Sequence, residues 1–479
     1  MTPALMIPTI LLPILSGICL PALKIEDDSS IKRFTILITV LTSLLSWGLI
    51  LTCSDEALYI VSFANRLHFV LRLDGMGRFF AGIVATLWPL TTLYSFEYLE
   101  HDDRKRPFYV FFLLSYGATL GVAMAGNLFS LYCFYELLTL TTVPLVLHTQ
   151  TPAAIRATRL YLSISIGGAA FVFLSIVYLV FHHGPLVADA ESQFFYLMGF
   201  FGFAVKAAVF PLHVWLPKAS VAPTPVTALL HAVAVVKAGV FAIIRLTWFS
   251  YGPALLSGTT AQTIALCFVI FTIVFGSAAA VKEKHFKRRM AYSTVANLSY
   301  ILFGVLLLTE DGLAAGLLHM AFHAELKILL FFCVGIVMEK TGREYLHQLD
   351  GLGKQMPVTF GCFAVGALGL IGIPPFAGFV SKWNLLSAGL SGGTFLSGLG
   401  SAALLISALL TAIYCLTPLR RAFFPDRQAE LSELNKIHDP GWRMSLPILI
   451  LAAGILVTGL CAGAMESAIA GVIETVRPW

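Results

Sequence analysis

Three titratable side chains recur at every fourth position of one apolar segment: His319, His323 and Lys327. A step of four residues along an α-helix advances 400°, so the three side chains form one stripe about 12 Å long. Histidine titrates near pH 6.5, and proton transfer through bridging waters needs a row of such groups. An i, i+4 histidine pair also suits zinc, but no third ligand follows by motif and a lysine completes the stripe instead. The stripe therefore predicts a proton path and no metal site, with Glu325 off the stripe and directed toward a neighbouring helix.

Further ionisable residues lie inside apolar segments, where a charge is costly and needs a partner, water or a function. Glu136 stands in the middle of one segment, and Lys206 is its natural cationic partner. We interpret the two as a proton-handling pair; an ion pair that only locks two helices is the alternative. Lys237 and His231 share another segment, six residues apart and so about 240° around one helix, and each is expected to meet a different neighbour. For His231, a hydrogen-bonded core histidine is the alternative.

The elements that carry these residues are membrane spans. Of the 479 residues, 58% are hydrophobic and 12% are charged, with a mean hydropathy of +0.85, whereas a soluble chain has about 25% charged residues. A span needs roughly 20 apolar residues, so the length accommodates about 14 spans in one membrane domain over 1–479. We predict an all-α polytopic membrane protein with spans at 3–23, 33–53, 76–98, 107–125, 127–148, 157–181, 192–216, 222–249, 260–281, 290–308, 312–338, 356–388, 393–420 and 443–468. The cysteines stand singly without ligand spacing, so we expect no cofactor on this chain.

Prolines break two of these spans. Pro211 interrupts the seventh, and Pro374 and Pro375 interrupt the twelfth. Proline removes a helical hydrogen bond, and non-helical backbone at membrane depth persists only where protein or water satisfies it. The breaks are five spans apart, an offset that reverses direction, as in an inverted repeat around a transport site; two ordinary proline kinks are the alternative. Lys382 follows the second break and is interpreted as a terminal proton site or, if the break shortens the helix, as a residue at the outer interface.

The distribution of basic residues predicts orientation. With the N-terminus outside, the inside loops hold 22 of the 31 Lys and Arg residues and the outside loops and tail hold 3. Because basic loops stay on the cytoplasmic side, we predict a multi-pass protein of the cell inner (plasma) membrane with both termini outside. Basic loops facing the anionic leaflet explain the net charge of +5 without a nucleic-acid partner. The cluster at 282–289 is either a determinant of this topology or a docking patch. Arg78 and Arg245, near the ends of spans, are expected to extend toward the interface.

Five short motifs follow one another along the chain: PLHVWLP at 211–217, APTPVTALLH at 222–231, RMAYST at 289–294, HMAFH at 319–323 with Lys327, and GIPPFAG at 372–378. In this order they resemble the antiporter-like membrane subunit family. That family comprises the proton-pumping subunits of respiratory complex I, the large subunits of Mrp-type sodium/proton antiporters and the ion-pumping subunits of membrane-bound hydrogenases. The resemblance covers residues 70 to 420, and it implies two inverted five-helix repeats, placed at 107–249 and 260–420, with two broken helices.

The resemblance also implies roles for the buried charges. Glu136 resembles the glutamate of the family's fifth helix, and Lys206 resembles the lysine of the seventh helix that pairs with it. Lys237 resembles the central lysine of the eighth helix, with His231 beside it, and Lys382 resembles the terminal lysine of the twelfth helix, which is a glutamate in some members. The eleventh-helix stripe matches the family's connecting groups: His319, His323 and Lys327.

The chain departs from the family at three positions. Lys218 stands where an aspartate commonly follows Trp-Leu-Pro, and His285 replaces an aspartate that is common before the RMAYST segment. Glu325 occupies a position where an apolar residue is usual. The first two departures bear on how protons enter from the cytoplasmic side, and not on the axis within the membrane.

These features together predict a subunit that translocates protons, or sodium ions against protons, within a redox-driven pump or an Mrp-type antiporter. The chain has no redox motif, so the energy must come from a partner of the NADH/quinone, ferredoxin or hydrogenase type, or from an opposing ion gradient. Other membrane subunits, further antiporter-like subunits among them, and a cytoplasmic redox arm are the expected partners. A stand-alone secondary transporter for a small solute is the alternative, but the midplane groups here are mostly titratable and run as a line, which suits protons.

Overall fold

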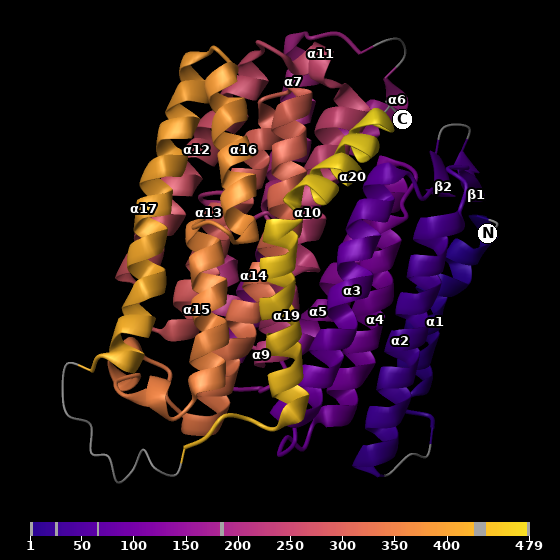
Figure 1. Ribbon diagram of the computed structural model, residues 1–479. Coiled ribbons are helices and arrows are strands. Elements are labelled where there is room, and N and C mark those ends of the chain that lie inside the picture. Colours follow the sequence, from indigo (N-terminus) through magenta and orange to yellow (C-terminus); the bar gives the residue numbers. More distant parts are fainter. Residues whose placement is uncertain (1–2, 24–26, 65–66, 183–185, 426–436, 477–479) are drawn as a thin grey trace.

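The chain forms a bundle of helices that run between two faces (Figure 1). The computed structural model describes residues 3–23, 27–64, 67–182, 186–425 and 437–476. Among them, nine helices are long and apolar enough to cross a membrane, and two more apolar helices are shorter. The prediction of a helical polytopic membrane protein is thereby confirmed, while the count of spans and the two repeats stay predictions.

The first part of the chain supplies six of its helices. They follow the short helix η1 (Pro3–Leu5) and are α1 (Met6–Cys19), α2 (Asp28–Thr52), α3 (Gly75–Tyr98), α4 (Lys105–Ala123), α5 (Leu128–Val146) and α6 (Pro152–Phe181). Side-chain caps set several starts: Asp27, Asp74, Asn127 and Thr151 each accept a hydrogen bond from the backbone N–H three residues ahead. Such caps satisfy N–H groups that have no partner within the helix.

A β-hairpin between α2 and α3 corrects the all-α prediction. Strands β1 (Leu58–Ala64) and β2 (Leu67–Leu71) pair antiparallel. An isolated hairpin is only marginally stable in water, so its contacts with the bundle matter: the Val70 N–H donates to Ser130 Oγ of α5 at 2.7 Å, and Leu71 forms a β-bridge with Ala125. These contacts come from a segment more than fifty positions away, and the local pattern contains no sign of them.

The first predicted break, indicated by Pro211, is present in the structure. After α7 (Ala190–Ala204) the chain leaves the helix and resumes as η2 (Leu212–Val214) and α8 (Trp215–Ala219). The freed backbone groups find side-chain partners: Phe210 N–H donates to Thr272 Oγ1 at 3.0 Å, and Trp215 Nε1 donates to the Val205 carbonyl at 2.7 Å. Irregular backbone is thus satisfied within the protein, as membrane depth requires.

The eighth predicted span is not one helix, which is a second correction. It consists of α9 (Thr224–Ala232), α10 (Val235–Ile244) and the π-helix η3 (Arg245–Tyr251), followed by α11 (Pro253–Leu256). Between α9 and α10, Val233 and Ala234 leave helical geometry. The angle of 240° expected between His231 and Lys237 therefore does not apply, because no continuous helix joins them.

The second half of the chain is built around one long helix, α14 (Glu310–Thr341). Its neighbours include α3, α9, α13 (Phe286–Leu306), α15 (Pro357–Ile371), α16 (Ala377–Ser391), α19 (Trp442–Leu460) and α20 (Ala462–Glu474). The remaining elements are α12 (Thr260–Lys282), η4 (Leu346–Gln348), η5 (Leu352–Lys354) and α17 (Phe395–Phe423). In Figure 1, α12 and α17 lie at the side opposite α1 and α2, with α14 between them. The predicted stripe thus lies on the central helix of this half.

The second predicted break separates α15 from α16. Gly372 ends α15 in the left-handed region with φ +92°, which favours glycine. Pro374 and Pro375 follow, and α16 begins at Ala377. The two helices lie very close at this point, because a Cβ on Gly378 would lie 1.9 Å from the carbonyl oxygen of Gly369.

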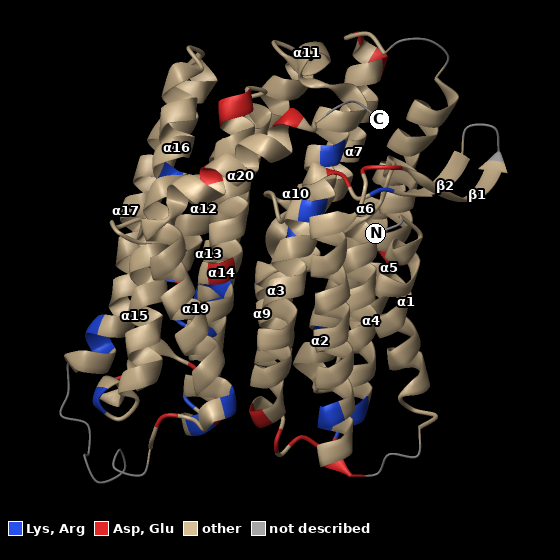
Figure 2. Cartoon of the chain, turned by 45° about the vertical axis from the view of Figure 1, so that its right-hand side comes forward, with Lys and Arg blue, Asp and Glu red and all other residues tan. Residues whose placement is uncertain are grey.

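The loops predicted inside meet at one face of the bundle. Asp28 pairs with Lys32 at 2.7 Å and with Lys105 at 3.3 Å, and Lys340 pairs with Glu97 at 3.2 Å. Figure 2 shows Lys and Arg gathered at the lower end of the helices, with Asp and Glu among them. Five residues of the charge count lie outside the described residues: Lys24, Arg66, Arg427, Lys436 and Arg477. The side of the membrane that this face occupies stays a prediction.

Candidate functional site: a line of buried lysines and histidines

Lys206 lies at the first break, directly after α7, and is 1% exposed. Its ammonium donates to the carbonyl of Tyr135 and lies 3.3 Å from the centroid of the Tyr135 ring. Glu136, the next residue of α5, interacts electrostatically with Lys206, but among the described residues no contact ion pair joins them and Glu136 Oε1 has no hydrogen-bond partner. The predicted partners are therefore neighbours, with the ammonium held by Tyr135.

Lys237 of α10 contacts the stripe directly. Its Nζ lies 3.0 Å from His323 Nδ1, and both side chains are fully buried. The approach between the first break and α10 depends on Gly239, since a Cβ there would lie 2.5 Å from the backbone N of Ala207 and 2.8 Å from the carbonyl carbon of Lys206. Close packing thus brings the backbone at Lys206 next to the helix that carries Lys237.

His319 continues the line toward the second break. Its ring lies 5.9 Å from that of His323, and its Nδ1 is 2.9 Å from Ser381 Oγ of α16. Its Nε2 is 3.2 Å from Asn297 Oδ1 of α13, and Tyr300 stacks on it at 5.3 Å. Both ring nitrogens therefore have polar partners from other helices. Among the described residues, no three His, Cys, Asp or Glu side chains come together as a metal site.

Lys382 lies beside the second break and satisfies backbone groups that the break leaves without helical partners. Its Nζ donates to the carbonyls of Leu370 and Ile371, at 2.7 and 3.1 Å, at the C-terminal end of α15. A cation is favourable there because the helix dipole is negative at that end. The ammonium also lies 5.3 Å from the ring centroid of Tyr300, which stacks on His319. Lys382 therefore belongs to the same cluster as His319.

Lys327 and His231 stand to one side of this line. Lys327 is fully buried and donates to the Met290 carbonyl at 3.0 Å and to Ser293 Oγ. His231 is also fully buried, stacks on Phe331 at 4.8 Å, and has no hydrogen-bond partner for either ring nitrogen among the described residues. Among the described residues His231 therefore lacks the protein partner that the alternative of a hydrogen-bonded core histidine requires.

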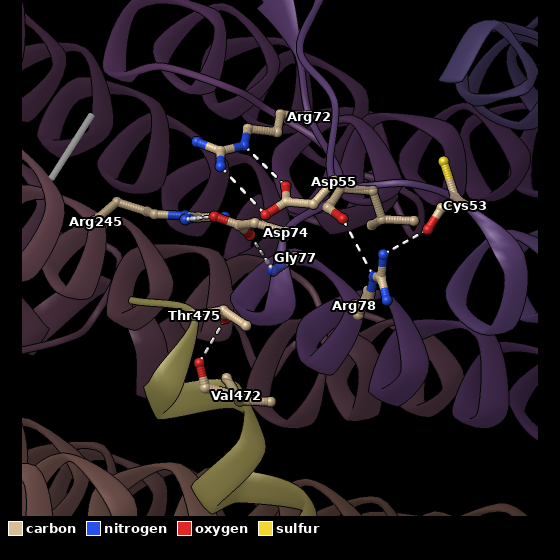
Figure 3. A network of polar contacts seen from close by, with 10 residues as sticks. Cys53, Asp55, Arg72, Asp74, Gly77, Arg78, Arg245, Val472 and Thr475 are labelled. Atoms are coloured by element: carbon tan, nitrogen blue, oxygen red, sulfur yellow. Dashed lines mark hydrogen bonds and ion pairs between the residues drawn. The ribbon is translucent and has the colours of Figure 1, made fainter. Parts of the chain in front are cut away.

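Glu325 and Arg245 have partners on other helices. Glu325 Oε2 accepts from Thr458 Oγ1 of α19 at 3.3 Å. Arg245 is fully buried and forms a bidentate pair with Asp74 at 2.5 and 2.6 Å, so the expectation that it extends to the interface is wrong. In Figure 3 the pair lies between Arg72 and the end of α20.

Arg78, which was also expected to extend toward the interface, forms hydrogen bonds within the protein. It is half-buried and donates to the carbonyl of Cys53 at 2.6 Å and to that of Leu73 at 3.2 Å (Figure 3). The network shown there ties the start of α3 to the end of α2 and to the start of η3. Sequence reasoning missed it because the acidic partner, Asp74, stands outside the predicted spans.

Two of the three departures from the family lie at the face of the bundle where the basic loops meet, which we call the basic-loop face. Lys218 is exposed, whereas His285 is partly buried and lies 3.5 Å from Glu344. Burial and the nearby Arg288 hold the pKa of His285 below its ordinary value, against the opposing effect of Glu344. Both residues therefore lie where an entrance to the axis would be, outside the buried line.

Several partners at the site carried no signal of their own in the sequence. Tyr135 holds Lys206 through its backbone carbonyl and its ring, while the side chains of Asn297 and Ser381 hold His319. The RMAYST segment did contain a usable signal, because its Met290 and Ser293 are the partners of Lys327. The sequence identified this segment as a motif, but its contact with Lys327 is visible only in the structure.

Comparisons with known proteins place the chain in a family. The family described as the transmembrane part of NADH:quinone oxidoreductase and Mrp antiporter subunits matches residues 125–411. NADH-quinone oxidoreductase subunit N of Desulforudis audaxviator is 34% identical over 421 residues, covering 83% of this chain and 82% of that protein. A Na(+)/H(+) antiporter subunit of Alkalihalophilus pseudofirmus is 30% identical over 86% of this chain, which spans only 55% of that longer protein.

Solved structures share the fold. A chain of the membrane-bound sulfane sulfur reductase, an archaeal respiratory membrane complex, has a TM-score of 0.86 at 24% identity and covers 98% of this chain and 97% of its own. A chain of the Mrp complex from Dietzia sp. DQ12-45-1b has a TM-score of 0.84 at 20% identity, covering 99% and 97%. A chain of respiratory complex I from Thermus thermophilus has a TM-score of 0.83 at 22% identity, covering 98% of both. The resemblance drawn from five motifs is confirmed: this chain belongs to the NADH:quinone oxidoreductase/Mrp antiporter transmembrane family.

Proposed function

We propose that this chain translocates protons across the plasma membrane as one component of a larger complex. The observation that carries the proposal is the line of buried groups from the first break to the second, with Lys237 in contact with His323 at 3.0 Å at its centre. Relatives in the family belong to an NADH–quinone oxidoreductase and to a sodium/proton antiporter. The partners proposed are other membrane subunits, and the chain itself carries no redox cofactor.

The proposed transfer begins at Lys206. Glu136 stabilises the protonated ammonium electrostatically, and an opposite charge nearby favours the charged form of a titratable group. Movement of the irregular backbone at the first break would separate the two and release a proton toward Lys237. Gly239 keeps this distance short, since α10 lies against the backbone of Lys206.

From Lys237 the proton passes to His323 and then toward His319. A neutral imidazole accepts a proton on one nitrogen and releases one from the other, so each histidine becomes neutral again as the opposite tautomer, and reorientation of the ring restores the first tautomer. His319 lies beside Ser381 of α16, and Ser381 directly precedes Lys382 in the chain. Lys382 is the proposed terminal group, from which the proton leaves on the opposite face.

The finer architecture is part of the same proposal. About 14 spans with both termini outside, and inverted repeats at 107–249 and 260–420, agree with the basic-residue count and with one break in each predicted repeat. The energy source is a redox partner or an opposing ion gradient. Whether sodium is exchanged for protons depends on that partner.

Reconstitution of the purified complex in proteoliposomes tests the proposal. His323→Gln keeps side-chain size and hydrogen bonding but cannot carry a proton near neutral pH. We expect proton translocation to fall at least tenfold in a complex that still assembles. The matched control is His347→Gln, at an exposed histidine in η4. Wild-type translocation by an assembled His323→Gln variant would contradict the proposed axis.

A further inference from the structure

A cavity opens at the basic-loop face, away from the line of groups described above. It has a volume of about 510 Å³ and is bounded by the end of α3, the start of α9, the start of α13 and the end of α14. Titratable side chains from four separate segments line it: His101, Asp102, His285, Lys287, Glu339 and Glu344. A cavity of this size and polarity can hold water, since a buried water needs only a small volume and two to four polar partners.

Lys287 is the deepest charged group of this lining. It is 3% exposed, and its Nζ donates to the Ala222 carbonyl at 2.5 Å, just before α9 begins. Its charge interacts with Glu344 at the cavity and with His231 inside the bundle. Lys287 thus stands between a polar cavity and a buried histidine.

His231 lies in the last turn of α9, beyond Lys287. Neither of its ring nitrogens has a hydrogen-bond partner among the described residues, although the side chain is fully buried. Burying a polar group without a partner costs free energy, so such a residue is unusual without a function. Two cations act on it electrostatically: Lys287 of α13 from the cavity side and Lys327 of the α14 stripe.

We propose that this cavity is the proton entrance of the second half of the chain, and that Lys287 and His231 carry protons from it to Lys327. The inference rests on the proposed function and adds the entry branch to it. In each step one N–H bond breaks as another forms: the Lys287 ammonium gives a proton through water to neutral His231, and the neutral amine then takes a proton from cavity water. His231 passes its proton to a neutral Lys327 amine, so one positive charge moves inward and no oxidant or reductant is needed.

The proposal explains two features that the axis does not use. Lys287 belongs to α13, and Lys327 donates to the Met290 carbonyl of the same helix. His231 interacts electrostatically with both lysines, and among the described residues it forms no hydrogen bond with Lys237 or His323. His285, which departs from the family's aspartate, lines the mouth opposite Glu344. A neutral imidazole can both accept and donate a proton, so a histidine can serve an entrance as a carboxylate can.

A purely structural role for Lys287 is the competing explanation, because its hydrogen bond to Ala222 clamps the start of α9. Lys287→Arg separates the two roles. Arginine keeps the charge and a hydrogen-bond donor, but it does not release its proton in a protein. We expect Lys287→Arg and His231→Gln each to assemble normally and to lower proton translocation at least tenfold. The matched control is Lys284→Arg. Lys284 is an exposed lysine of the same basic cluster at 282–289 and does not line the cavity, so this variant should translocate protons at the wild-type rate.

Four variants measured in the same proteoliposomes distinguish the possible failures. If His323→Gln abolishes translocation while Lys287→Arg and His231→Gln translocate at the wild-type rate, the axis stands and the entrance proposed here is wrong. If His323→Gln also translocates normally, the proposed function itself fails. Loss in Lys287→Met with full activity in Lys287→Arg would show a clamp and would overturn the transfer role of Lys287.

Discussion

Removing Arg245 should destabilise the protein by far more than a surface arginine would. Arg245 is fully buried and Asp74 is 2% exposed, and the two form a bidentate pair. Arg245→Met keeps much of the apolar side chain but leaves the Asp74 carboxylate buried without its cation. Breaking a buried pair in this way costs about 3–5 kcal/mol.

The same network contains a matched control. Arg72 pairs with Asp55 at 2.8 Å, but both side chains are about one-third exposed, at 29% and 38%. Exposed pairs contribute roughly 0–1 kcal/mol, so Arg72→Met should be nearly neutral. Asp74→Asn with Arg245→Met removes both charges and keeps an N-cap for α3, and it should recover most of the loss seen in Arg245→Met.

The pH dependence of the protein's stability follows from the Asp74–Arg245 pair. Burial raises the pKa of Asp74, but the Arg245 guanidinium and the Gly77 N–H act more strongly together and hold it below its ordinary value of 3.8. A carboxyl with a lowered folded-state pKa stabilises the fold above about pH 3.8, and this stabilisation is lost as the pH falls through the lower value. The wild type should therefore lose stability in that acidic range, and the double variant should lose less.

Unfolding of the purified protein in mild detergent, followed by circular dichroism against denaturant, measures these differences. The expected order of stability is wild type and Arg72→Met first, the double variant next and Arg245→Met last. An Arg245→Met variant within about 1 kcal/mol of the wild type would refute the reasoning, since a broken buried pair costs more than that. A double variant no more stable than Arg245→Met would refute it as well.

Four further outcomes are expected. Lys206→Ala should abolish translocation, measured in proteoliposomes, without loss of assembly, and an assembled variant that pumps normally would contradict its role. Replacing both His319 and His323 by Gln should lower translocation at least tenfold, while elemental analysis finds no stoichiometric metal on the wild-type chain; zinc lost on His323→Gln would contradict the proton path. A cysteine at position 285 should react with an impermeant reagent from the cytoplasmic side only, and labelling from outside would reverse the topology. Lys382→Met should lower translocation and also shift thermal stability downward, because the carbonyls of Leu370 and Ile371 lose their donor; unchanged stability would contradict this contact.

The local sequence was sufficient to predict the features that depend on the bilayer or on the backbone chemistry of a short segment. Long apolar runs interrupted by charged loops identify spans because the bilayer excludes unsatisfied polar groups. Pro211 and the pair at 374–375 indicated two breaks because proline removes a helical hydrogen bond and crowds the preceding turn, although Pro89 and Pro144 lie inside helices that continue. The one-sided array on α14 followed from helical periodicity alone.

The interruption between α9 and α10 could not be predicted from the local sequence. Val233 and Ala234, where the helix is interrupted, include neither glycine nor proline. The interruption changes which residues share a face, so the angle of 240° between His231 and Lys237 does not apply, although each does meet a different neighbour, Phe331 and His323. A close approach such as that of Gly239 to the backbone of Lys206 is visible only once the helices are packed.

Partners distant in the chain account for the remaining differences. The sequence by itself determined that this is a helical membrane protein, that several of its lysines and histidines lie within spans, and which family it resembles, but it did not reveal that Lys287 is buried. Only the tertiary structure decided that Arg245 pairs with Asp74, 171 positions away, that Lys206 is held by Tyr135, 71 positions away, and that His319 lies against Ser381, 62 positions away. The physical reason is that apolar burial depends on composition over about 20 residues, whereas a hydrogen bond or ion pair depends on atoms within about 3 Å whose positions only the packed helices define.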